Sequence, residues 1–112
     1  MTTLDKTTLE KLPEITTRIV KASHPDKIIL LGSYGRGDDG PDSDLDLLVV
    51  ISGIKHLRAE STRLRGELRG LLVPVDIVVT TPEQLERLKN VSGLIYHRVM
   101  TEGKVVYERP QA

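Results

Sequence analysis

The chain has 112 residues, which suits a single domain over residues 1–112 with a modest aliphatic core. Its formal net charge is zero at pH 7, so no general attraction to nucleic acid or to an anionic membrane is expected. It has no cysteine, which excludes disulfides and thiolate chemistry, and no apolar run approaches the roughly 20 residues that span a bilayer. A cytoplasmic protein with neither membrane nor direct nucleic-acid contacts is therefore predicted.

The first third of the chain predicts a helix followed by a strand. Residues 2–23 carry apolar residues at helical spacing, and Pro13 either kinks this helix or marks its first turn. A turn at 23–26 leads to an aliphatic strand over 27–31, which Gly32 ends.

The middle of the chain predicts a second strand and an amphipathic helix. Residues 45–51 are apolar on both faces, which indicates an internal strand. Residues 54–72 then predict a helix whose core side would hold Ile54, Leu57, Leu64, Leu68 and Leu71. Its outer side carries Lys55, Arg58, Arg63, Arg65 and Arg69, which is more typical of a solvated face than of an RNA site.

The last third predicts further short elements. A strand over 75–79 precedes a helix over 81–89, which starts with a Thr cap, a Pro and an acidic residue. Residues 94–101 resume a helical pattern, and 105–107 form a last strand. Because helices alternate with short strands, the predicted fold class is α/β (α+β), with a small mixed sheet flanked by helices.

Two aspartates stand at the start of the second strand. Asp44 and Asp46 are two positions apart, so both side chains would project from one face with Cα atoms about 6–7 Å apart. Carboxylates at that spacing can share two divalent cations about 3.5–4 Å apart. Oxygen ligands favour Mg²⁺, and the three histidines are too scattered to offer Zn²⁺ a better site. Asp38, Asp39 and Asp42 are explained by turn chemistry alone.

A small-residue turn precedes the aspartates. Gly32 allows close backbone approach, and Ser33 offers a hydroxyl and an N–H to an anion. Arg36 could add a charged donor to a phosphate, or it could be a solvated loop residue. This stretch therefore predicts a phosphate-binding turn next to a metal-binding pair.

Asp76 is the candidate for a third carboxylate. It lies within an aliphatic strand, where a bare buried charge would be costly. If that strand neighbours the one with Asp46, Asp76 could reach the same metal and accept a proton from an attacking hydroxyl. The alternative is an exposed edge-strand residue or an ion pair with an arginine.

The spacing of these residues resembles a known family. The chain has Gly-Ser, then ten residues, then Asp-x-Asp, and later an Asp on an aliphatic strand. This order and spacing are similar to the motif of polymerase-β-type nucleotidyltransferases. The fuller pattern in this short chain is Gly-Ser-Tyr-Gly-Arg-Gly followed by Ser-Asp-Leu-Asp-Leu-Leu-Val. It resembles the minimal nucleotidyltransferase (MNT) antitoxins that pair with HEPN-family ribonuclease toxins. The resemblance implies that Asp44 and Asp46 bind both of two Mg²⁺ ions, that Asp76 binds one, and that Gly32-Ser33 holds the triphosphate.

The resemblance also implies an activity and its partners. The expected reaction moves AMP from ATP to a hydroxyl of a HEPN toxin, with tyrosine as the expected acceptor, and this transfer silences the toxin. The chain could also form a homo- or hetero-oligomer. Two alternatives stay open: a non-catalytic antitoxin that neutralises its partner by binding, and a nucleotidyltransferase that modifies a small molecule. With no second domain for a small acceptor, a protein partner is favoured.

Overall fold

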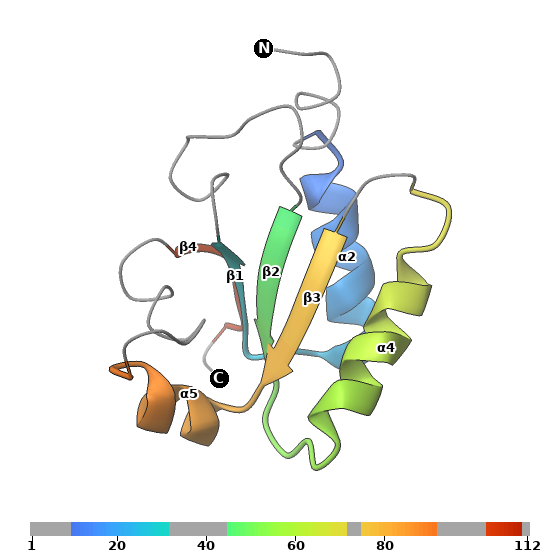
Figure 1. The fold of residues 1–112 in the computed structure, drawn as a ribbon. Coiled ribbons are helices and arrows are strands. Elements are labelled where there is room, and N and C mark those ends of the chain that lie inside the picture. Colours follow the sequence, from blue (N-terminus) through green and yellow to red (C-terminus); the bar gives the residue numbers. More distant parts are fainter. Residues whose placement is uncertain (1–9, 32–44, 72–74, 92–102, 111–112) are drawn as a thin grey trace.

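The computed structural model describes residues 10–31, 45–71, 75–91 and 103–110, which build a four-stranded sheet with helices on both faces (Figure 1). The elements in chain order are α2 (Leu12–Ser23), β1 (Lys27–Leu31), β2 (Leu45–Val50), α4 (Leu57–Glu67), β3 (Val75–Thr80), α5 (Pro82–Leu88) and β4 (Lys104–Glu108). The strand order is β3-β2-β1-β4. β2 runs parallel to β3, and β1 is antiparallel to β2 and β4. The predicted small mixed sheet is confirmed.

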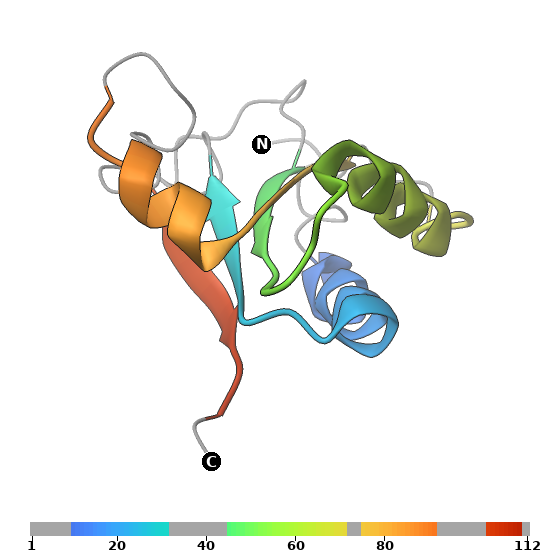
Figure 2. The same cartoon turned by 90° about the horizontal axis from the view of Figure 1, so that it is seen from below.

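Alternating side chains divide the core between the two faces of the sheet. Helices α2 and α4 cover one face, and α5 lies on the other (Figure 2). On the α2–α4 face, the main buried residues are Ile15, Ile19, Ile28, Leu30, Leu45, Leu47, Val49, Leu64, Ile77 and Val79. The smaller cluster on the α5 face joins Ile29, Leu31, Leu48 and Val50 to Val78 and Leu85. Because β2 is buried on both faces, its prediction as an internal strand is confirmed.

The helix boundaries follow their proline and glycine residues. Helix α2 begins at Leu12 with Pro13 in its first turn, so the second interpretation of Pro13 fits the described residues. Helix α4 is shorter than the predicted 54–72 because the chain turns after Glu67, and Gly70 adopts a φ of +94°. Leu68 and Leu71 nevertheless remain buried beyond the helix.

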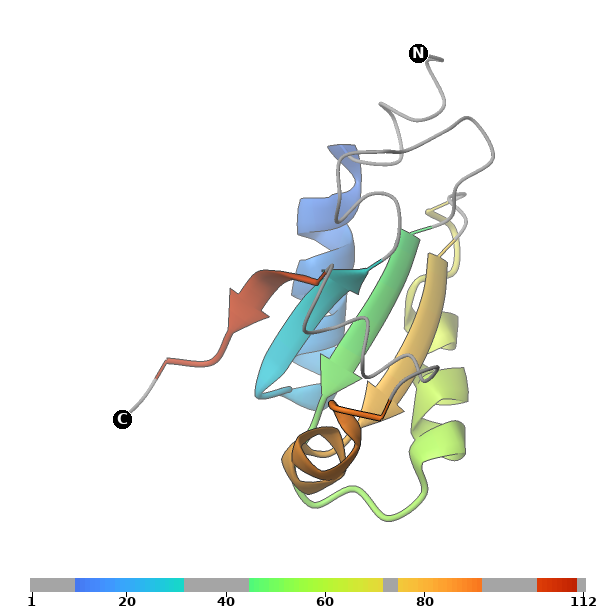
Figure 3. The same cartoon turned by 60° about the vertical axis from the view of Figure 1, so that its left-hand side comes forward.

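The remaining elements lie close to their predicted positions. Thr81 caps α5 by accepting a hydrogen bond from the backbone N–H of Gln84 at 3.1 Å. β4 lies at the edge of the sheet remote from β3 (Figure 3). The helical pattern predicted for 94–101 lies outside the described residues. No helix in the described ranges is long and apolar enough to cross a membrane.

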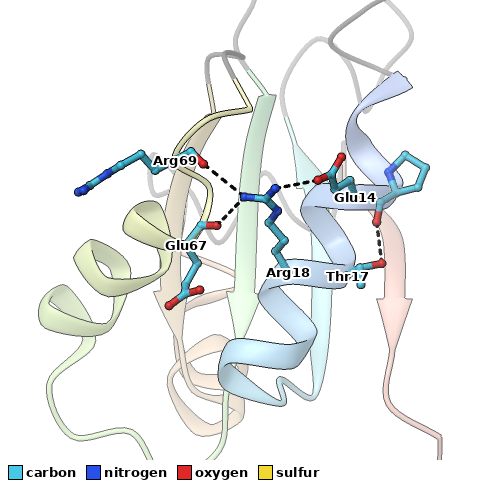
Figure 4. Close-up of polar contacts among 6 residues, drawn as sticks. Glu14, Thr17, Arg18, Glu67 and Arg69 are labelled. Atoms are coloured by element: carbon cyan, nitrogen blue, oxygen red, sulfur yellow. Dashed lines mark hydrogen bonds and ion pairs between the residues drawn. The ribbon is translucent and has the colours of Figure 1, made fainter.

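Arg18 joins α2 to the end of α4 (Figure 4). Its Nη1 donates to the backbone carbonyls of Glu67 and Arg69 at 3.2 and 3.3 Å, and its Nη2 donates to Glu14 Oε2 at 2.8 Å. These carbonyls belong to the last turn of α4 and the residues after it, where intrahelical donors run out. Arg18 therefore holds the segment of chain that leads from α4 toward β3.

Candidate active site

Asp46 and Asp76 face each other across the β2–β3 pair. In the parallel register Asp46 lies opposite Asp76, and on the other side of β2 it lies opposite Leu31. Adjacent strands are about 4.8 Å apart, so the two carboxylates project from neighbouring backbone positions. The condition set from the sequence, that the Asp76 strand neighbours the Asp46 strand, is met.

Both carboxylates lie on the face of the sheet opposite α2 and α4. Asp46 shares its side of β2 with Leu48, and Asp76 shares its side of β3 with Val78, and both of these apolar residues belong to the α5-side cluster. Asp46 is half-buried, whereas the Asp76 side chain is 59% exposed. The carboxylate oxygens of Asp46 and Asp76 can therefore contact a ligand that approaches from solvent.

The exposure of Asp76 corrects one argument from the sequence. Its aliphatic neighbours predicted a costly buried charge, but β3 is an edge strand and Asp76 lies in solvent beside an arginine. The two alternatives predicted for Asp76, an exposed edge-strand residue or an ion pair with an arginine, both describe its surroundings. What singles out Asp76 is its register with Asp46 rather than its burial.

That arginine is Arg65 of α4, which sequence reasoning had assigned to a solvated face. Its Nη2 lies 3.3 Å from Asp76 Oδ1 and donates to the backbone carbonyl of Ile77 at 3.2 Å. One turn earlier on the same helix, Ser61 Oγ accepts a hydrogen bond from the backbone N–H of Val79 at 3.2 Å. Two α4 side chains spaced i and i+4 thus bind the outer edge of β3. No signal in the sequence singles out Arg65, because its contacts depend on where α4 packs against β3.

The other predicted site residues lie outside the described ranges. Asp44, Gly32, Ser33 and Arg36 all belong to the stretch between Leu31 of β1 and Leu45 of β2. The chain leaves the sheet and returns to it at the end where Asp46 and Asp76 stand. The assignments of these four residues remain predictions.

The two described carboxylates fit a hard divalent cation. They supply oxygen atoms from one face of adjacent strands, which is the donor type that Mg²⁺ prefers. Among the described residues, no group of three or more His, Cys, Asp or Glu side chains is placed to hold a metal ion. Asp46 and Asp76 can thus supply only part of a ligand set.

A cavity of about 900 Å³ opens at the other end of the sheet, between α5 and β4. Ile29, Val50, Leu85 and Val105 contribute apolar walls, and charged residues line its rim. Residues of opposite charge are paired here. Lys27 Nζ lies 3.7 Å from Oε2 of its cross-strand neighbour Glu108, and Arg109 forms an ion pair with Asp26. Neither Asp46 nor Asp76 lines this cavity.

Comparison with known proteins identifies the class. Residues 9–106 match the model of the nucleotidyltransferase domain family, and the chain belongs to that family. A relative from Methanocaldococcus jannaschii, named as a protein adenylyltransferase, is 31% identical over 83 residues, which cover 72% of this chain and 77% of the relative. The protein is therefore a nucleotidyltransferase.

Solved structures share the fold at lower sequence identity. A crystal structure from Sulfolobus solfataricus, described as a nucleotidyltransferase, superposes with a TM-score of 0.67 and 21% identity, covering 97% of this chain and 90% of that one. A toxin–antitoxin structure with AMP-PNP gives a TM-score of 0.59 and 22% identity, covering 86% and 73%. Both likenesses support the polymerase-β-type fold predicted from the sequence.

Proposed function

We propose that this protein transfers AMP from ATP to a tyrosine hydroxyl of a HEPN-family ribonuclease toxin and thereby acts as its antitoxin. The observation that carries the proposal is the register of Asp46 with Asp76 on the α5 side of the sheet, where the Asp76 side chain is 59% exposed, in a chain of the nucleotidyltransferase family. The relative named as a protein adenylyltransferase and the toxin–antitoxin structure with AMP-PNP support the choice of acceptor and nucleotide.

The proposed metal ligands are Asp46 and Asp76 together with Asp44, and two Mg²⁺ ions are the proposed occupants. When bound, such ions polarise the attacking oxygen and neutralise the charge of the leaving phosphates. Asp46 lies on the internal strand β2, so its backbone is held from both sides. That placement fixes the backbone position from which one carboxylate of the pair projects, and an in-line displacement depends on such positioning.

Asp76 is the proposed proton acceptor. The acceptor oxygen forms a bond to the α-phosphorus, the bond from that phosphorus to the bridging oxygen breaks, and pyrophosphate leaves. The hydroxyl proton passes to the Asp76 carboxylate, whose exposure allows a protein side chain to approach it. Gly32 and Ser33 are the proposed phosphate-binding residues, and Arg36 is a proposed third phosphate contact.

The test is transfer of label from α-³²P-ATP, in the presence of Mg²⁺, to the protein encoded beside this chain. We expect labelling of a tyrosine, mapped by mass spectrometry, and its loss in Asp46→Asn. Full inhibition of the partner by Asp46→Asn without any label would instead indicate an antitoxin that acts by binding. Label on an aminoglycoside, with none on protein, would indicate a small-molecule enzyme.

A further inference from the structure

Arg65 is held beside Asp46 and Asp76 by a hydrogen bond to the backbone as well as by its ion pair. The same Nη2 atom contacts Asp76 Oδ1 and the backbone carbonyl of Ile77, so the guanidinium is tied to the main chain of β3. The buried Ser61, one turn earlier, ties α4 to Val79 of the same strand. A cation therefore stands at a defined place beside one of the two carboxylates.

The contact with Asp76 leaves that carboxylate able to bind a second group. Arg65 engages one oxygen, Oδ1, and an ionised carboxylate has about four acceptor positions. Asp76 is also 59% exposed, so solvent or a ligand can reach it while the ion pair persists. Arg65 can therefore orient Asp76 without blocking it.

The charge of Arg65 acts oppositely on two kinds of ligand. It offsets one of the two negative charges of Asp46 and Asp76, so it opposes the binding of a bare divalent cation. A metal–nucleoside triphosphate complex is a net anion, so the same guanidinium attracts it. The residue thus favours metal that arrives already bound to the nucleotide.

We propose that Arg65 is a positioning residue that orients Asp76 and selects a metal–nucleoside triphosphate over a free divalent cation. This inference rests on the proposed function, because it assumes that Asp46 and Asp76 hold metal. It assigns the selection to one side chain of α4.

The test measures binding of two probes separately at low ionic strength: Mn²⁺ alone, followed by electron paramagnetic resonance, and Mg²⁺ with α,β-methylene ATP, followed by calorimetry. For Arg65→Gln we expect Mn²⁺ to bind about two- to fivefold more tightly and the metal–nucleotide to bind about two- to fivefold more weakly. Both changes should shrink as salt is added, since the effect is electrostatic. Arg65→Lys should restore both affinities toward wild type.

The matched control is Arg69→Gln, which removes the same charge close to the end of α4. The Arg69 side chain points away from Arg18 (Figure 4), and Arg65 is the arginine that contacts Asp76, so we expect neither affinity to change in Arg69→Gln. Equal shifts in Arg65→Gln and Arg69→Gln, a shift of both probes in one direction, or no shift at all would overturn the inference. Wild-type protein that binds neither probe would overturn the proposed function itself.

Discussion

The two ends of the sheet differ in the charges that face each other across neighbouring strands. At one end, like charges lie opposite each other, Asp46 against Asp76. At the other end, opposite charges are paired, Lys27 against Glu108. Cross-strand pairs of opposite charge stabilise a sheet, whereas like charges placed directly opposite destabilise it.

The difference distinguishes the candidate site from the cavity between α5 and β4. The charges that line this cavity include two opposite-charge pairs, Lys27–Glu108 and Asp26–Arg109. The end with Asp46 and Asp76 places two carboxylates opposite each other, with Arg65 beside Asp76. Two facing carboxylates are typical of functional sites, where a cation is expected to bind.

The largest expected effect is on catalysis at the acidic end. Asp46→Asn or Asp76→Asn should lower the rate of AMP transfer by at least about 100-fold, because each removes a proposed metal ligand and not a supporting group. The matched control is Glu108→Gln at the other end, which should retain near wild-type transfer. The rate of label transfer from α-labelled ATP measures these effects, and circular dichroism verifies that each variant is folded. Equal losses in Glu108→Gln would remove the distinction between the ends.

A smaller effect is expected on the stability of the α4–β3 connection. Arg18→Ala should lower the free energy of unfolding by about 1 kcal/mol, because the carbonyls of Glu67 and Arg69 lose their charged donor. Arg69→Ala keeps its own carbonyl and should change stability by less than about 0.5 kcal/mol. Urea unfolding measures both values. If Arg69→Ala were as destabilising as Arg18→Ala, the backbone contacts would not be the cause.

The smallest expected effects are the couplings between the cross-strand pairs. A double-mutant cycle on Asp46→Asn and Asp76→Asn in metal-free buffer should give a repulsive coupling of about 0.2–1 kcal/mol. The same cycle on Lys27→Met and Glu108→Gln should give an attractive coupling in that range. Both couplings should weaken with added salt. Couplings of the same sign would contradict the contrast between the two ends.

Much of the fold follows from local patterns in the sequence. The apolar run of β2 indicates an internal strand because both of its faces need cover, and the Thr81-Pro82 start of α5 carries its own cap. The end of α4 was less predictable, since Leu68 and Leu71 stay buried after the helix has stopped. The spacing of apolar residues indicates which positions are buried, and in this chain buried positions continue past the last turn of α4.

The site was only partly predictable. Spacing predicted Asp44 and Asp46 as a pair and an aliphatic strand predicted Asp76, but the edge position of β3 could not be predicted, because strand order depends on tertiary packing. For the same reason Arg65 could not be told apart from the other basic residues of α4. Its role depends on where the helix lies against β3. Gly32, Ser33, Arg36 and Asp44 remain predictions of the sequence.

The most direct test of the central claim is the location of a bound divalent ion. Mn²⁺ titrated into ¹⁵N-labelled protein broadens the amide signals of residues close to the ion. We predict that the signals of Leu31, Asp46 and Asp76 are lost first, while those of Lys27 and Glu108 persist, and that Asp46→Asn abolishes this pattern. Early loss at Lys27 and Glu108, or an unchanged pattern in Asp46→Asn, would contradict the assignment of the acidic end as the active site.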